Sequence, residues 1–286
     1  MSSIWYYATA NDDESEDLAL VSECIYCKSR LKRDYLAERE VRFQDDLGLW
    51  DDKRPDAIPV IGICLVCGWW KYGVKRLWPT KKGEPEIKEV EIRYGLLKEL
   101  SLSDITLPIE EVRRYLMANY ESRFGVHPRL FEEVVASVFK DEGYDTLVTA
   151  YSGDGGIDVI MSNSSNEQIG VQVKRYKNSI SVEQIRAFTG ALVIRGLTKG
   201  IFVTTSNYQS GAESAAQVSG MRGYPIELID ADKFYEKLEF VQISSYSKTE
   251  LPKPWMDVEF LWGRNYQPSR QSRRNRNVEH RVKHRK

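Results

Sequence analysis

A chain of 286 residues can bury two cores, and 42% hydrophobic with 29% charged residues is the composition of a globular protein rather than a disordered one. No apolar run reaches the ~20 residues that a membrane-spanning helix needs, and the opening MSSIWYYATANDDESED lacks the basic-then-apolar pattern of a signal peptide. We therefore expect a cytoplasmic protein without membrane contact.

All four cysteines fall in two Cys-x-x-Cys pairs near the N-terminus, Cys24 with Cys27 and Cys64 with Cys67. Four thiolates in two such knuckles complete a closed tetrahedral site of the kind that zinc ribbons use. Two disulfides or a dithiol redox motif compete with zinc, although a reducing cytoplasm disfavours disulfides and no thioredoxin-like surroundings are present. The pattern predicts a small zinc-ribbon-like module over residues 1–76, held by structural Zn²⁺.

The role of this module is open, because a zinc-held unit can bind nucleic acid, bind a protein partner or simply hold its own fold together. Trp69 and Trp70 directly follow the second knuckle. They can stack on bases, but packing beside the metal site is favoured, since so small a module lacks a large core. Residues 77–127 should form a linker and a connecting helix, because a Pro-, Gly- and charge-rich stretch precedes an apolar helical pattern.

The next domain is expected at residues 128–242 and begins with an amphipathic helix. Its apolar residues share one stripe: Phe131, Val134, Val135, Val138 and Phe139. At about 100° per residue, Glu132 lies at the edge of this stripe and can face inward, whereas Glu133 points to solvent. Three strand-like runs, a helix, a strand, a helix, a strand and a last helix follow. This order predicts an α/β domain with a mixed sheet flanked by helices.

Polar residues interrupt two of these strands. The runs GIDVIM and QIGVQVK can form a hairpin that turns at residues 162–166, which brings Asp158 approximately opposite Gln172. Strand alternation then puts Lys174 on the same face as Gln172. Carboxylate and amide oxygens suit Mg²⁺, and an ammonium group stabilises negative charge, so together they suit phosphodiester hydrolysis. A solvent-facing strand is the simpler explanation for an isolated pattern of this kind.

Several motifs in order make the pattern more specific. The Phe-Glu helix, the Asp-Gly-Gly-Ile-Asp strand entrance at 154–158, the Gln-x-Lys strand at 172–174 and the Thr-Thr-Ser strand end at 204–206 resemble the catalytic domain of the Mrr-type restriction endonucleases. That family belongs to the PD-(D/E)xK nuclease superfamily. The resemblance implies a restriction-endonuclease-like core and a metal-dependent DNA endonuclease, acting in restriction or antiviral defence against modified or foreign DNA.

Residue by residue, the resemblance implies that Asp158 is the principal ligand of Mg²⁺ or Mn²⁺ and that Lys174 is the catalytic lysine. Glu132 matches the helix glutamate that completes the metal site. Gln172 stands where most members of the superfamily have a carboxylate, and an amide binds cations less tightly, so metal affinity can be modest until DNA phosphate joins the site. Asp154 matches the first aspartate of its motif, and a turn-capping role is as well supported as a catalytic one.

Four side chains close to this site are candidates for DNA binding, although packing or a solvated surface explains them equally well: Arg175, Tyr176, Gln184 and Arg186. Residues 243–286 are expected to be a C-terminal extension with a disordered basic tail. Residues 264–286 carry nine Lys or Arg against the single acidic Glu279. Such a tail can attract phosphate backbones or merely aid solubility.

DNA is thus the expected partner, and cleavage of both strands favours a homodimer or sequential attack, although no feature of the sequence establishes dimerisation. An alternative function is a DNA-binding or interaction subunit that keeps the nuclease fold but is inactive or needs a partner. A repair or junction-cleaving nuclease is a further alternative within the same class.

Overall fold

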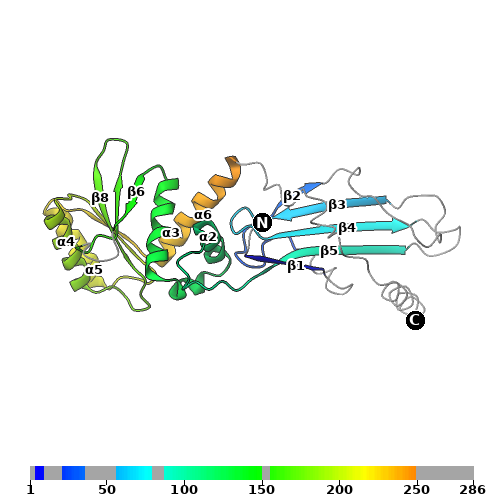
Figure 1. The fold of residues 1–286 in the computed structure, drawn as a ribbon, viewed down its shortest axis with the longest axis horizontal. Coiled ribbons are helices and arrows are strands. Elements are labelled where there is room, and N and C mark those ends of the chain that lie inside the picture. Colours follow the sequence, from blue (N-terminus) through cyan, green and yellow to red (C-terminus); the bar gives the residue numbers. More distant parts are fainter. Residues whose placement is uncertain (1–3, 10–20, 36–55, 79–86, 150–154, 249–286) are drawn as a thin grey trace. The chain divides into compact units, whose positions relative to one another are not determined.

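The computed structural model describes residues 4–9, 21–35, 56–78, 87–149 and 155–248. Its first sheet is antiparallel, with the strand order β1-β5-β4-β3-β2 (Figure 1). The strands are β1 (Trp5–Thr9), β2 (Lys32–Tyr35), β3 (Asp56–Ile63), β4 (Trp70–Trp78) and β5 (Ile87–Leu97). The two cysteine knuckles lie next to this sheet in the chain, one before β2 and one between β3 and β4.

This sheet continues beyond the module that the sequence suggested. Strand β4 passes residue 76, and β5 lies within the expected linker over 77–127, yet β5 pairs with β4 from Trp78↔Ile87 to Lys71↔Tyr94. The Pro-, Gly- and charge-rich stretch therefore joins two strands of one sheet. The expected connecting helix follows as α2 (Ile109–Ala118) and is extended by a short 3₁₀ helix, η2 (Tyr120–Gly125).

The second sheet is mixed and has the order β10-β9-β8-β7-β6. Its strands are β6 (Asp145–Val148), β7 (Val159–Ser162), β8 (Gln168–Lys174), β9 (Gly200–Thr204) and β10 (Ile226–Ile229). Its helices are α3 (Pro128–Asp141), α4 (Val182–Arg195), α5 (Ser210–Met221) and α6 (Ala231–Lys248). Strands β6, β7 and β8 pair antiparallel, while β8, β9 and β10 pair parallel. The predicted order of elements and the α/β fold class are confirmed.

Helices cover both faces of this sheet. Figure 1 shows α4 and α5 on one side and α3 with α6 on the other. Val171 and Val173 of β8 belong to a buried cluster with residues of α3, whereas Phe202 of β9 packs with residues of α4. Gly170 and Gly200 allow α4 to approach closely, because a Cβ there would lie 2.8 Å and 2.7 Å, respectively, from a methyl of Leu192. The sheet is therefore a central layer between two helical layers.

Two further expectations concern other parts of the chain. Within the described ranges, every helix is too short or too polar to span a lipid bilayer. The basic tail at 264–286 and Asp154 lie outside the residues that the structure describes.

Candidate active site and cysteine cluster

The two Cys-x-x-Cys knuckles bring four sulfur atoms together. In the first knuckle the Cys24 N–H donates to Ser29 O at 2.8 Å, and in the second the Cys64 N–H donates to Trp69 O at 2.7 Å. All four Sγ atoms lie within 4.8 Å of one another. The Sγ atoms of Cys24 and Cys67 are 3.4 Å apart, and those of Cys27 and Cys64 are 3.3 Å apart.

This spacing fits four thiolates around one tetrahedral ion, because Zn–S bonds of about 2.3 Å place the sulfurs ~3.8 Å apart. It excludes disulfides, in which the sulfurs are about 2.0 Å apart, and all four cysteines are free. The residue after each second cysteine has a positive φ, 65° at Lys28 and 82° at Gly68, so the two knuckles turn alike. The predicted four-cysteine cluster is confirmed, and its donor set is that of a structural zinc site.

The aromatic residues around the cluster are packing residues. Trp69 and Trp70 are 0% and 4% exposed, and the Trp69 indole N–H donates to Gly95 O at 2.7 Å. Tyr26, inside the first knuckle, accepts the Leu97 N–H at 2.9 Å and its ring packs against Trp69. The packing role favoured for the tryptophans is confirmed, because buried rings cannot stack on bases.

In the second sheet, the predicted hairpin forms with the predicted register. Val159 pairs with Val171, and the Asn163 side chain closes the turn by accepting two N–H groups of the turn residues. At Asp158 the regular pairing of β7 with β8 is interrupted. The Asp158 N–H donates to Val171 O at 2.9 Å, although Val171 is already paired with Val159. Two consecutive residues thus face Val171, which is the pattern of a β-bulge. Asp158 therefore lies one residue from the position opposite Gln172 that the sequence suggested.

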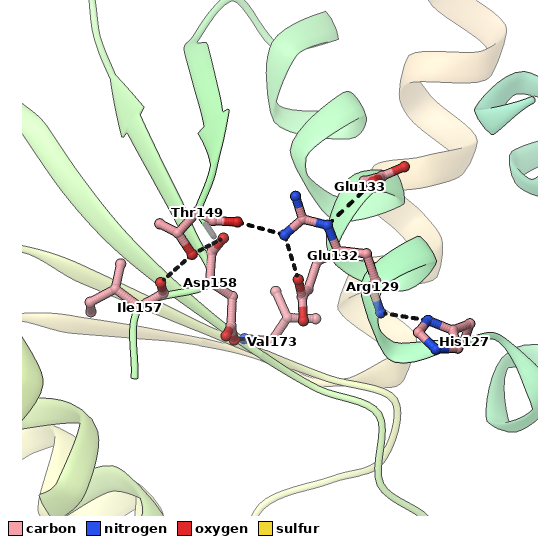
Figure 2. Close-up of polar contacts among 8 residues, drawn as sticks. All are labelled: His127, Arg129, Glu132, Glu133, Thr149, Ile157, Asp158 and Val173. Atoms are coloured by element: carbon pink, nitrogen blue, oxygen red, sulfur yellow. Dashed lines mark hydrogen bonds and ion pairs between the residues drawn. The ribbon is translucent and has the colours of Figure 1, made fainter. Parts of the chain in front are cut away.

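The bulge carries a buried carboxylate to the end of β8. Asp158 is 7% exposed, and its Oδ2 accepts the Val173 N–H at 2.6 Å (Figure 2). Val173 separates Gln172, which is also buried, from Lys174, which is half-buried. The Lys174 carbonyl accepts the Thr205 N–H at 3.1 Å, which ties this end of β8 to β9. The structure therefore brings Asp158, Gln172 and Lys174 to one end of the central strands.

Helix α3 adds a second carboxylate beside the sheet. The Glu132 side chain is 19% exposed and that of Glu133 is 36% exposed. In Figure 2, Arg129 and Glu132 extend from α3 toward the strands, and the Glu133 carboxylate points away. Arg129 Nη1 lies 3.3 Å from Glu132 Oε2 and donates to Thr149 O at 2.7 Å. The orientations of both glutamates agree with the helical periodicity of the sequence.

The four candidates for DNA binding divide into two groups. The side-chain Oε1 of Gln184 accepts the Ser181 N–H at 2.9 Å in the capping box of α4. The Arg175 guanidinium donates to Phe124 O. These two side chains already have structural partners. Tyr176 is 46% exposed and Arg186 is exposed, so both can reach a ligand.

The α/β core has a helix, three antiparallel strands, a crossover helix and a parallel strand, and Asp158 and the Gln-x-Lys segment lie at the ends of its central strands. Residues 125–238 match the family model of the Mrr catalytic domain, described as restriction endonuclease. The chain is also 31% identical over 149 residues to the type IV methyl-directed restriction enzyme EcoKMrr of Escherichia coli strain K12. Residues 125–238 are thus similar to the catalytic domain of Mrr-type restriction endonucleases.

This similarity is partial in length. It covers 49% of this chain and 47% of the Escherichia coli enzyme, so the chain spans about half the length of the curated relative that it matches. The family match runs from α3 into the first half of α6, and the first sheet with its cysteine cluster lies before it.

Sequence reasoning missed Arg129 and Thr149, which link α3 to the start of β7. One feature of the sequence points to Arg129, namely its position in the first turn of the expected helix. A cation in the first turn of a helix opposes the helix dipole and is unfavourable there without a partner.

Proposed function

We propose that the chain is a metal-dependent DNA endonuclease that hydrolyses phosphodiester bonds in modified or foreign DNA. The observation that carries the proposal is the buried Asp158 carboxylate, bonded to the Val173 N–H between Gln172 and Lys174 in a domain similar to the Mrr catalytic domain. The name of the Escherichia coli relative, a methyl-directed restriction enzyme, supports methylated DNA as the substrate. Such an enzyme acts in the cytoplasm, in restriction or antiviral defence.

The donor set fits a divalent cation with hard oxygen ligands. Asp158, Gln172 and Glu132 would hold Mg²⁺ or Mn²⁺, which prefer carboxylate and amide oxygens. Buried polar side chains such as Asp158 and Gln172 are costly to desolvate, so their place at a strand end calls for a functional reason. When bound, the ion supplies Lewis acidity and lowers the pKa of a bound water.

The residues of the chain supply the remaining chemistry. The Val173 N–H fixes one oxygen of Asp158 and thereby orients the carboxylate. The Lys174 ammonium stabilises the negative charge that develops on the phosphate. Gln172 contributes a neutral oxygen, so the site repels a phosphate less than three carboxylates would, and it also attracts a cation less strongly. Tyr176 and Arg186 are exposed and contact the DNA backbone in this proposal.

The proposal also assigns roles to the parts of the chain. The zinc module runs to Leu97, where the first sheet ends, and residues 98–127 connect it to the catalytic domain at 128–242. Zn²⁺ holds the two knuckles, and the module targets the enzyme by binding DNA or a protein partner. A second copy of the chain serves the second DNA strand, and the extension over 243–286 adds phosphate attraction.

Plasmid cleavage tests the proposal. Purified protein is incubated with Mg²⁺ or Mn²⁺ and with methylated or unmethylated plasmid, beside Lys174→Ala and the control Lys140→Ala. Lys140 is an exposed lysine in the last turn of α3. Wild type and Lys140→Ala should nick and linearise the methylated plasmid, and Lys174→Ala should leave it intact. If wild type cleaves neither plasmid, the proposal is refuted in favour of a subunit that only binds DNA or needs a partner.

A further inference from the structure

We infer that Arg129 is a positioning residue that holds Glu132 and Asp158 in place and thereby sets the affinity of the nuclease site for a divalent cation. The inference rests on the proposed nuclease function. It assigns a task to a residue that is not itself a metal ligand.

Helix stability does not explain an arginine at this place. Arg129 is the second residue of α3, after Pro128, and its N–H donates to the His127 Nδ1 that caps the helix, at 3.2 Å. Helix N-termini carry partial positive charge, so a cation there costs about 0.3–1 kcal/mol unless other contacts compensate. The contacts of the guanidinium must therefore supply the reason for this residue.

Those contacts bridge the helix and the sheet. Arg129 Nη1 donates to Thr149 O at 2.7 Å and lies 3.3 Å from Glu132 Oε2, so one nitrogen joins the end of β6 to a site carboxylate (Figure 2). Nε lies 3.4 Å from Glu133 Oε1 on the outer side of the helix. The Arg129 side chain is only 22% exposed, which weakens solvent screening of these pairs.

Thr149 extends the connection to Asp158. Its backbone N–H donates to Asp158 O at 2.9 Å, and its hydroxyl is within bonding distance of Ile157 O at 2.8 Å and Asp158 O at 3.0 Å. Figure 2 shows this path from the guanidinium through Thr149 to the start of β7. A shift of Arg129 would therefore move the backbone at Asp158 as well as the Glu132 carboxylate.

The charge of Arg129 acts in the opposite sense, because a guanidinium beside the site stabilises the empty pair of carboxylates and repels a cation. The weaker Mn²⁺ binding expected without Arg129 therefore comes from the lost geometry of the ligands. Two carboxylates near one site repel each other, and an adjacent guanidinium offsets that repulsion. The planar fork of arginine donates in fixed directions, which a lysine ammonium does not reproduce. Residues that orient metal ligands typically change metal affinity by about 10–100-fold when they are replaced.

Calorimetric titration of the full chain with Mn²⁺, in the presence of duplex DNA, tests the inference without relying on turnover. Arg129→Met should bind Mn²⁺ about 10–100-fold more weakly than wild type. The control Glu133→Gln, which removes the outer partner of the same arginine, should bind like wild type. Arg129→Lys should stay several-fold weaker, and full recovery by lysine would mean that the planar fork is not needed, which would overturn the positioning role. Affinity in Arg129→Met equal to or tighter than in wild type would also overturn it.

Thermal unfolding shows whether each variant is folded, and Arg129→Gln replaces Arg129→Met if the latter does not fold. Plasmid cleavage by the same proteins separates the two claims. Wild type that binds Mn²⁺ but does not cut refutes the nuclease function and leaves the positioning role standing. Wild type that cuts, beside Arg129→Met with unchanged Mn²⁺ affinity, overturns the positioning role alone. Wild type that binds no Mn²⁺ overturns both.

Discussion

Asp158 has two roles that substitution can separate. It is the proposed metal ligand, and it accepts the Val173 N–H. Asp158→Ala removes both the charge and the acceptor, whereas Asp158→Asn removes the charge and keeps a carbonyl oxygen for the same hydrogen bond. We expect both variants to lose cleavage and only the alanine variant to lose substantial stability.

The magnitude follows from the geometry at the bulge. Asp158 is 7% exposed and its bond to the Val173 N–H is 2.6 Å long, so the alanine variant leaves a buried N–H without its partner. This costs ~1–3 kcal/mol. Each kcal/mol shifts Tm by about 4 °C in a domain of the length of residues 128–242, so Asp158→Ala should lower Tm by about 4–12 °C. In Asp158→Asn the loss of a buried charge offsets the weaker neutral hydrogen bond, and Tm should stay within about 2–4 °C of wild type.

Differential scanning calorimetry measures the two Tm values, and plasmid cleavage under Mg²⁺ measures activity on the same preparations. The reasoning is refuted if alanine and asparagine lower Tm equally, because the retained carbonyl would then have no effect. It is equally refuted if Asp158→Ala unfolds at the temperature of wild type.

Three further predictions concern the fold. Removing Zn²⁺ from the four-cysteine site with a chelator should lower the Tm of the catalytic domain together with that of the zinc module. The reason is that three of the cysteines share one buried cluster with α3. An unchanged catalytic-domain transition in calorimetry would contradict this prediction. Gly200→Ala should lower the free energy of unfolding in urea by ~1–3 kcal/mol, because the added Cβ would clash with α4. The control Gly190→Ala, whose added Cβ would meet nothing within 4 Å, should raise it by ~0.5–1 kcal/mol. The opposite order of the two free energies would contradict this prediction. Gly68→Ala should cost ~1–2 kcal/mol at φ 82°, while Lys28→Gly at the matching turn should be tolerated, and equal losses of stability would rule out the conformational explanation.

Local sequence patterns predicted much of the fold. The order of helices and strands from Pro128 onward follows from periodicity, and the pairing of Val159 with Val171 follows from the centre of the turn. The boundary of the first sheet did not follow. A Pro-, Gly- and charge-rich stretch looks the same whether it joins two strands or two domains, and only the pairing of β5 with β4 distinguishes the cases.

The candidate site divides in the same way. The sequence by itself determined which residue types meet: four cysteines in two knuckles, an inward Glu132, and Asp158 near Gln172 and Lys174 at one strand end. These groupings depend on the spacing of residues along the chain, which decides which side chains share a face of a helix and which residues pair in a hairpin.

Only the tertiary structure decided how these groups are held. The bulge at Asp158, the bond from Arg129 to Thr149 and the capping role of Gln184 each depend on a hydrogen bond to a backbone group. Every residue except proline carries the same backbone donor and acceptor, so side-chain identity does not reveal which of them a polar side chain will meet. That choice depends on how the packed helices and strands place the backbone around each side chain.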